Sequence, residues 1–376
     1  MTGQQLRERI AAALEDQGFR LRDDRILPPA DLDKDKVRVL HAMAIRHRIE
    51  TAREGLRHHE GTLLQRIAAG REVEPSRVAP SLIEVRPESD DELLFRYASL
   101  HWSIPVSSGY GRRLRFLVVD EHNGKLIGLF GLGDPVFALA SRDQWIGWDK
   151  EARRQRLHHV ADAFVLGAVP PYSALLGGKL VAMLVACSEV REAFMSKYTK
   201  RESVILQRRL DGQLALITTT SALGRSSIYN RITLPGRLLY HSVGFTRGSG
   251  EFHFSNGTYA EISRFVEENC QPTAKQQRWG KGFRNRREVV RKCLAALDLP
   301  AEWIYHGVQR EVFVLPLARN TQEFLRGEEN KLVCFNDPAQ QIFAWFRERW
   351  LLPRAKRDRR YREFIPSSYA LWNGTE

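Results

Sequence analysis

The chain has 376 residues, of which 43% are hydrophobic, and a formal net charge of +13. This length is too great for one small core and indicates two or three domains, while the ordinary apolar fraction excludes a disordered chain. Lys179 and two glycines interrupt the most apolar long window, and the first residues lack the apolar core of a signal peptide. We therefore expect a cytoplasmic protein without a membrane span.

Residues 1–85 show helical periodicity. Leu6, Ile10 and Leu14 recur at helical spacing, and Val37, Leu40 and Ala44 lie on one stripe of a second helix that follows an acidic turn. The neighbours His58 and His59 fall on a polar face, where we expect no metal. A helical N-terminal region is the prediction for this part of the chain.

Residues 86–260 change to a strand pattern. Two β runs flank Asn123-Gly124, a pair typical of hairpin turns. A further β run at 160–169 ends at two prolines, and a helix is expected over 173–195. Two more β runs are expected about Asp211-Gly212, and a last one over 250–259. This pattern predicts an α+β core with a mixed sheet.

Residues 261–376 are predicted to form a basic, mainly helical C-terminal region. The stretch after Arg284 is amphipathic, because Val290, Cys293, Leu294 and Leu297 share one face. The four cysteines form no C-x-x-C pair, so we expect buried free thiols.

Two basic segments carry almost all of the net charge. Residues 275–292 hold eight Lys or Arg and one acid, and residues 345–363 hold eight basic residues and three acids, which gives +7 and +5, or +12 of the +13. Such a confined positive field is typical of binding to a polyanion, and aromatic residues among the charges can stack on unpaired bases. The alternative is a solvated helix face. We expect both segments to lie at one end of the folded protein, where DNA or RNA would contact Arg278, Trp279, Lys281, Phe283, Arg284, Arg287, Arg291, Arg354, Lys356, Arg357 and Arg359.

The strand–turn–helix at 160–185 is a candidate phosphate site. A helix that opens near Gly177 and Gly178 can present backbone N–H groups to an anion, and Lys179 lies just inside it. No G-x-x-x-x-G-K-[ST] motif is present, which excludes a P-loop. The alternative is that the glycines permit close packing of the helix on the sheet.

The stretch "TTTSALGRSSIYNRI" is a second candidate ligand site. Polar side chains crowd the end of a strand, where they suit a pocket better than a core: Arg225, Ser226, Ser227, Tyr229 and Asn230. Tyr229 is the candidate general acid. The alternative is a capped helix with a half-buried tyrosine.

A metal site at His158, His159 and Asp162 is not expected. Neighbours on a strand point to opposite faces, so the two histidines would not reach one ion. We assign no metal ligands and leave any cofactor unassigned.

Five motifs in order resemble the DruA family of the Druantia anti-phage defence system. They are "HHVADAFVLGAVPPYSALLGGKLVAML", "TTTSALGRSSIYNRI", "YHSVGFTRGSGEFHF", "QRWGKGFRNRREVVRKCL" and "HGVQREVFVLPLARN". The resemblance spans roughly residues 5–360 and implies a role in defence against phage, together with other proteins of the same operon. It does not imply a particular chemistry.

The central part is also similar to the acyl-CoA N-acyltransferase (GNAT) fold. The hairpin, the strand at 160–169, the helix after it and "LLYHSVGF" come in the order of that fold. This chain departs from those enzymes in the pyrophosphate loop, because only Gly177 of "YSALLG" matches the glycine pattern of that loop. Pro170 and Pro171 also remove two N–H donors from the end of the strand. The resemblance therefore implies the fold rather than binding of acetyl-CoA.

These observations predict an α+β fold with a GNAT-like central sheet over 86–260 and helical flanks over 1–85 and 261–376. The leading hypothesis is a nucleic-acid-binding component of an anti-phage system. The alternative is a GNAT-related enzyme, or a sensor of a nucleotide or acyl ligand, that uses the residues near 170–180 and 224–230.

Overall fold

The computed structural model describes residues 2–106, 111–199, 201–203, 208–226, 228–255, 257–272 and 285–372. Helix α1 (Gly3–Asp16) starts with a capping box between Thr2 and Gln5. Helix α2 (Lys34–Leu56) follows and is capped at its start by the Asp33 carboxylate. Both helices were predicted. The small hairpin between them, β1 (Arg20–Arg22) with β2 (Arg25–Leu27), was not.

One mixed sheet forms the centre of the described structure, with seven strands in the order β12-β13-β9-β6-β5-β4-β3. All neighbouring strands are antiparallel except β6 and β9, which are parallel. This arrangement confirms the α+β fold class, and the GNAT resemblance stays a prediction. The strands are β3 (Pro80–Glu84), β4 (Arg113–Asp120), β5 (Lys125–Gly133), β6 (Val160–Ala168), β9 (Leu216–Thr220), β12 (His241–Phe245) and β13 (Glu311–Pro316).

The hairpin of β4 and β5 turns at the predicted pair Asn123-Gly124. Gly124 has a φ of 71°, the left-handed conformation that glycine adopts at little cost. Both strands are buried over most of their length, and this hairpin supplies side chains to both faces of the sheet.

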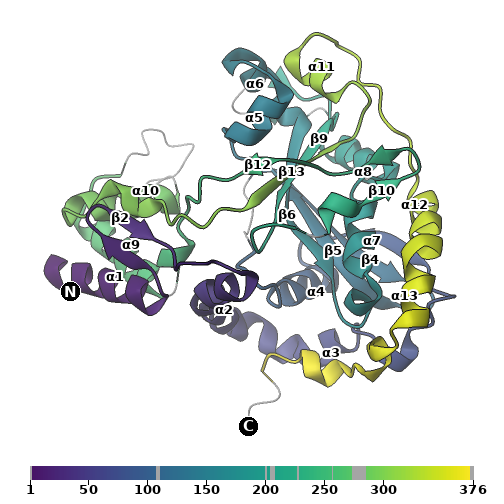
Figure 1. Ribbon diagram of the computed structural model, residues 1–376, viewed down its shortest axis with the longest axis horizontal. Helices are drawn as coiled ribbons and strands as arrows, with labels where there is room; N and C mark the ends of the chain where they lie inside the picture. Colours follow the sequence, from purple (N-terminus) through teal and green to yellow (C-terminus); the bar gives the residue numbers. More distant parts are fainter. Residues whose placement is uncertain are drawn as a thin grey trace.

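Helices cover both faces of the sheet (Figure 1). One face packs against α7 (Gly177–Leu184), α8 (Ser188–Tyr198) and α12 (Ala339–Phe346), around a core that includes Leu180, Phe313 and Phe346. The opposite face holds two further apolar clusters. One contains α4 (Asp90–Ser99), and the other contains α5 (Ala140–Ile146) and α11 (Thr321–Arg326).

A second, smaller core lies beside the sheet. Residues far apart in the chain form it: α1, the first part of α2, α9 (Thr258–Asn269) and α10 (Arg286–Ala296). The predicted apolar face of α10 is confirmed, because Val290, Cys293 and Leu294 are buried in this core. In Figure 1 this group of helices occupies the left end of the molecule.

Residues 339–372 form a segment that we call the outer strap. It begins with α12 and runs around the sheet. After α12 it forms the π-helical turn η9 (Arg347–Leu351), α13 (Leu352–Arg357), η10 (Arg360–Glu363) and η11 (Pro366–Tyr369). The buried carboxylate of Glu60 holds its end, since Glu60 Oε1 accepts hydrogen bonds from Leu371 N–H at 2.6 Å and Tyr97 O–H at 2.9 Å.

One strand prediction was wrong. Residues 250–259 contain the 3-10 turn η6 (Phe252–Phe254) and the start of α9, because Phe254 and its neighbour His253 are both buried rather than alternating. Of the two β runs expected about Asp211-Gly212, the second is confirmed as β9 of the main sheet, and β8 (Arg208–Arg209) in the first run pairs with β7 (Glu202–Ser203). The C-terminal region is mainly helical, as expected, and it also supplies the buried strand β13.

Buried histidines lie where the smaller core meets the sheet. Burial lowers the pKa of His253 to about 4, and its Nε2 lies 2.8 Å from the Trp303 carbonyl. Burial, followed by the charge of Arg310, lowers the pKa of His41 to about 4 as well. Between pH 6.5 and about 4 these rings stay neutral in the folded state but gain protons in the unfolded state. Their stabilisation is thus present above pH 6.5 and is lost as the pH falls.

We expect the free energy of unfolding to fall on acidification by about 1.4 kcal/mol per pH unit for each such histidine. Urea unfolding of the His253→Gln variant, measured from pH 7 to pH 5, should show a shallower decline by about this amount, because glutamine keeps a donor for Trp303 but does not titrate. The exposed His58, replaced by glutamine in the same way, serves as the control. An unaltered slope in His253→Gln would contradict the assignment.

Candidate nucleic-acid interface

The first basic segment is described from Asn285 onward. Arg278, Trp279, Lys281, Phe283 and Arg284 lie outside the described residues. Asn285 caps α10 through its side chain, so Arg287 and Arg291 are on the helix, the former half-buried and the latter exposed. Arg286 lies over the Tyr259 ring at 3.8 Å and donates to Ser255 Oγ. Part of this segment therefore holds α9 and α10 together.

The described part of the first basic segment does not form one surface with the second. Figure 1 shows α10 at the left end of the long axis, and α12 and α13 at the right end. The expectation that both lie at one end of the protein is wrong. The reason is the chain path, because α10 packs with α1 and α9 in the smaller core, whereas the outer strap follows β13 across the sheet and packs on α7.

The outer strap instead meets the predicted phosphate site. The Lys179 ammonium lies 5.4 Å from the centre of the Trp350 ring, and the Arg349 guanidinium lies 5.1 Å from the same centre. Burial lowers the pKa of Lys179, and the charges of Arg231 and Arg349 lower it further. We call Lys179, Arg231, Arg349 and Trp350 the Lys179 cluster. Among the described residues, none of its three cations has a carboxylate within 4.0 Å.

Other basic residues of the strap differ in how far they are paired. Arg354 pairs with Asp358 at 2.8 Å and donates to the Ala174 carbonyl, and Arg360 pairs with the same Asp358 at 2.6 Å. Arg360, and after it Arg354, holds the pKa of Asp358 well below its usual range. The single carboxylate offsets one of these two positive charges. Three further basic residues of the strap are exposed: Lys356, Arg357 and Arg359.

Gly177, the first residue of α7, serves packing, whereas Gly178 does not require glycine. A side chain at Gly177 would come within 2.9 Å of Ala168 Cβ and 2.7 Å of the Tyr172 carbonyl oxygen, so this position needs glycine. This agrees with the packing alternative weighed for the motif. A side chain at Gly178 would meet only Ile228, at 3.9 Å. That contact shows that the two candidate ligand stretches lie side by side.

The polar residues of the second stretch mostly bond to one another. Ser226 Oγ accepts from the Ile228 and Tyr229 N–H groups, and Asn230 donates to the Ser226 carbonyl. The Ser226 N–H donates to the buried Glu311 carboxylate at 2.9 Å. Arg225 is exposed, and Ser227 lies outside the described residues.

Tyr229 is packed rather than free. Its ring lies 4.9 Å from the Tyr240 ring and 5.0 Å from the Phe313 ring. Burial raises the pKa of the Tyr229 hydroxyl, although the hydrogen bond with Thr219 and the charge of Arg310 oppose the rise. The phenol therefore stays protonated at neutral pH.

Sequence reasoning missed a polar group where β6 and β9 separate. Asp162 and Thr218 form the last pair of these strands, and the Thr218 hydroxyl donates to the Asp162 carboxylate at 2.8 Å. Burial raises the pKa of Asp162, and Arg310 and Arg142 oppose the rise. Arg310 Nε donates to the Ser221 carbonyl at 2.8 Å. The sequence did not indicate that Arg310, which precedes β13, would lie near Asp162, because the two residues are far apart in the chain.

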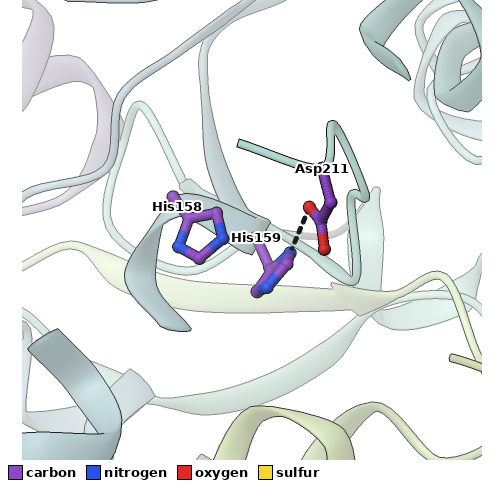
Figure 2. Close-up of side chains that lie close together, drawn as sticks. All are labelled: His158, His159 and Asp211. Atoms are coloured by element: carbon purple, nitrogen blue, oxygen red, sulfur yellow. Dashed lines mark ion pairs between the residues drawn. The ribbon is translucent and has the colours of Figure 1, made fainter. Parts of the chain in front are cut away.

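The histidines His158 and His159 adopt a conformation that the sequence argument did not foresee. They lie in the 3-10 turn η3 (Leu157–His159) before β6, so the alternation of a strand does not separate them. Their ring centres are 3.8 Å apart. Asp211, rather than Asp162, lies beside them, and Figure 2 shows its carboxylate facing His159.

These features define a mixed α+β protein with a cationic cluster on one side of its sheet. No helix in the part of the chain that the structure describes is both long and apolar enough to cross a membrane. The family described as Druantia protein DruA matches residues 31–327. The chain is 39% identical to a "Druantia protein DruA" from Escherichia coli (strain UMEA 4076-1) over 360 residues, which is 95% of this chain and 89% of the relative. The chain belongs to the DruA family. No solved structure matches it.

Proposed function

We propose that the chain acts in anti-phage defence and binds nucleic acid through the Lys179 cluster. Family membership supports the defence role. The observation that carries nucleic-acid binding is the gathering of Arg231 and Arg349 about Lys179, without a carboxylate partner among the described residues, where Lys179 and Arg349 lie against the Trp350 ring. Cations held in this way keep their charge for phosphates.

The charge balance of the cluster favours an anion. The Lys179 side chain is half-buried, and the two arginines oppose its positive charge. A phosphate placed among the three cations offsets this repulsion and raises the pKa of Lys179. The exposed Lys356, Arg357 and Arg359 on the same strap offer further contacts along a nucleic-acid backbone.

Binding to short single- and double-stranded DNA, measured across salt concentrations, tests this proposal. We expect the affinity to fall steeply with salt, because each neutralised phosphate releases counterions. A lack of affinity, or an affinity that does not change with salt, would reject it. Nuclease treatment of a pull-down separates this function from docking on an acidic protein partner.

A second candidate is a small-ligand site at the separation of β6 and β9. The observation that favours it is the nearness of two half-buried groups of opposite charge, Asp162 and Arg310, which influence each other without an ion pair within 4.0 Å. A ligand that accepts from the guanidinium and donates to the carboxylate would satisfy both.

Thermal unfolding with acetyl-CoA or with nucleotides tests the second candidate. We expect a bound ligand to raise the melting temperature by several degrees, since saturation at about 100 Kd stabilises the folded state by about 2.7 kcal/mol. The Asp162→Asn variant should lose this rise. Asp149→Asn, a change at the exposed cap of α6 (Lys150–Arg156), should keep it. If neither ligand shifts the wild-type protein, or if Tyr229→Phe keeps full phage protection, the enzyme hypothesis is weakened.

A further inference from the structure

We propose that His158, His159 and Asp211 form a binding site for a divalent transition-metal ion such as Zn²⁺. Each residue offers one ligand atom, and these atoms lie within 4.8 Å of one another. Two imidazole nitrogens and a carboxylate oxygen are donors that such ions prefer. The site joins the turn η3 to the loop before β9, and Figure 2 shows the three side chains together.

The spacing of the donors fits an ion. His159 Nδ1 and Asp211 Oδ1 are 3.6 Å apart. Two donors at about 2.1 Å from a tetrahedral zinc ion lie about 3.4 Å apart, so this pair already has the required separation. The Asp211 side chain is 45% exposed, so an ion can reach its carboxylate from solvent, and hydrogen bonds from Gln213 hold that carboxylate in place.

The backbone near His159 offers a further donor. His159 is the buried member of the three residues. Its Nδ1 lies 3.1 Å from the Gln213 carbonyl oxygen and donates its hydrogen there. When an ion binds Nδ1, this hydrogen moves to Nε2, and the Gln213 carbonyl oxygen becomes available as a fourth donor.

The neighbouring cations oppose an ion only weakly. The charges of Arg156 and Arg112 both act on His159, so both residues lie near the site. Arg112 is paired with Asp134 at 2.6 Å, and it donates to the His158 carbonyl. Arg156 donates to Asn330 Oδ1 at 3.1 Å. The Asp134 carboxylate offsets one of these charges.

An ion at this place would link the starts of two parallel strands. Val160, the residue after His159, pairs with Leu216 of β9. The pair of Asp162 and Thr218 lies two residues further along the two strands. The metal would therefore fix the point at which β6 and β9 begin before they separate. Metal binding at this site is independent of nucleic-acid binding, because the Lys179 cluster lies on other elements.

The test is metal binding by chelator-treated protein, measured by equilibrium dialysis with Zn²⁺ and by the visible absorption of Co²⁺. We expect one ion per chain in the wild type, and its loss in the His159→Gln variant. Asp211→Asn changes an exposed side chain and should weaken binding by about tenfold or more while the fold is kept.

The chain offers a matched control. His58 and His59 are also neighbours in a 3-10 turn, η1 (Arg57–His59), but both are exposed. The double variant His58→Gln/His59→Gln should bind the ion like the wild type. Absence of stoichiometric binding in the wild type overturns the proposal, as does binding that survives in both His159→Gln and Asp211→Asn.

Discussion

Replacing Lys179, Arg231 and Arg349 together by glutamine is expected to weaken DNA binding at least about tenfold at moderate salt. Each lost phosphate contact reduces the slope of log affinity against log salt by about 0.7 for single strands and about 0.9 for duplexes. Three lost contacts should therefore reduce the slope by about 2 to 3. Fluorescence anisotropy with short labelled DNA, titrated at several salt concentrations, measures both quantities.

The other end of the molecule supplies the control for this experiment. Arg264 and Arg291 are exposed and Arg287 is half-buried, all on α9 and α10 in the smaller core. Their triple replacement by glutamine removes the same net charge. We expect the affinity of that variant to stay within about threefold of the wild type. Equal losses in the two triple variants would show that overall charge, rather than the Lys179 cluster, governs binding.

The Glu60→Ala variant is expected to lose about 3 to 5 kcal/mol of the free energy of unfolding. Glu60 is fully buried, and its carboxylate accepts from Tyr97 O–H at 2.9 Å, Leu371 N–H at 2.6 Å and Trp372 N–H at 3.2 Å. Alanine leaves these buried donors without this acceptor. Glu60→Gln keeps one acceptor oxygen but not the charge, so it should lose about half as much. Urea unfolding measures both.

We expect Glu60→Ala to lower the free energy of unfolding by releasing the end of the outer strap. Removal of residues 365–376 deletes the donors of Leu371 and Trp372, so its effect and that of Glu60→Ala should overlap rather than add. The exposed Glu50 pairs with Arg53 at 3.4 Å, and Glu50→Ala should change stability by less than about 0.5 kcal/mol. Additive losses from the truncation and Glu60→Ala would mean that Glu60 acts through Tyr97 alone.

Local signals in the sequence predicted the elements that local forces determine. The β4–β5 hairpin followed from Asn123-Gly124, and α1 and α10 followed from apolar periodicity. Strands β3 and β13 were missed, because each is placed by pairing with distant segments. Phe313 pairs with Thr219 on one side and with Ser242 on the other, and neither partner is near it in the chain.

The sequence predicted individual residues of the candidate site but not their arrangement in space. Lys179 and the segment 345–363 were identified separately, as a phosphate contact and as a basic stretch. Nothing in the sequence indicated that Trp350 lies against Lys179, because that contact depends on the path of the outer strap over α7. The total charge was visible in the sequence, but its division between two ends of the molecule was not.

The position of β13 between β9 and β12 affects how the chain folds during synthesis. Strands β9 and β12 leave the ribosome well before β13, yet each pairs with β13 and not with the other. Until residue 316 has emerged, the nascent chain holds two unpaired strand edges and an unfilled apolar gap, the kind of surface that aggregates or recruits chaperones. Completion of the sheet is therefore a late, long-range step that makes folding slow.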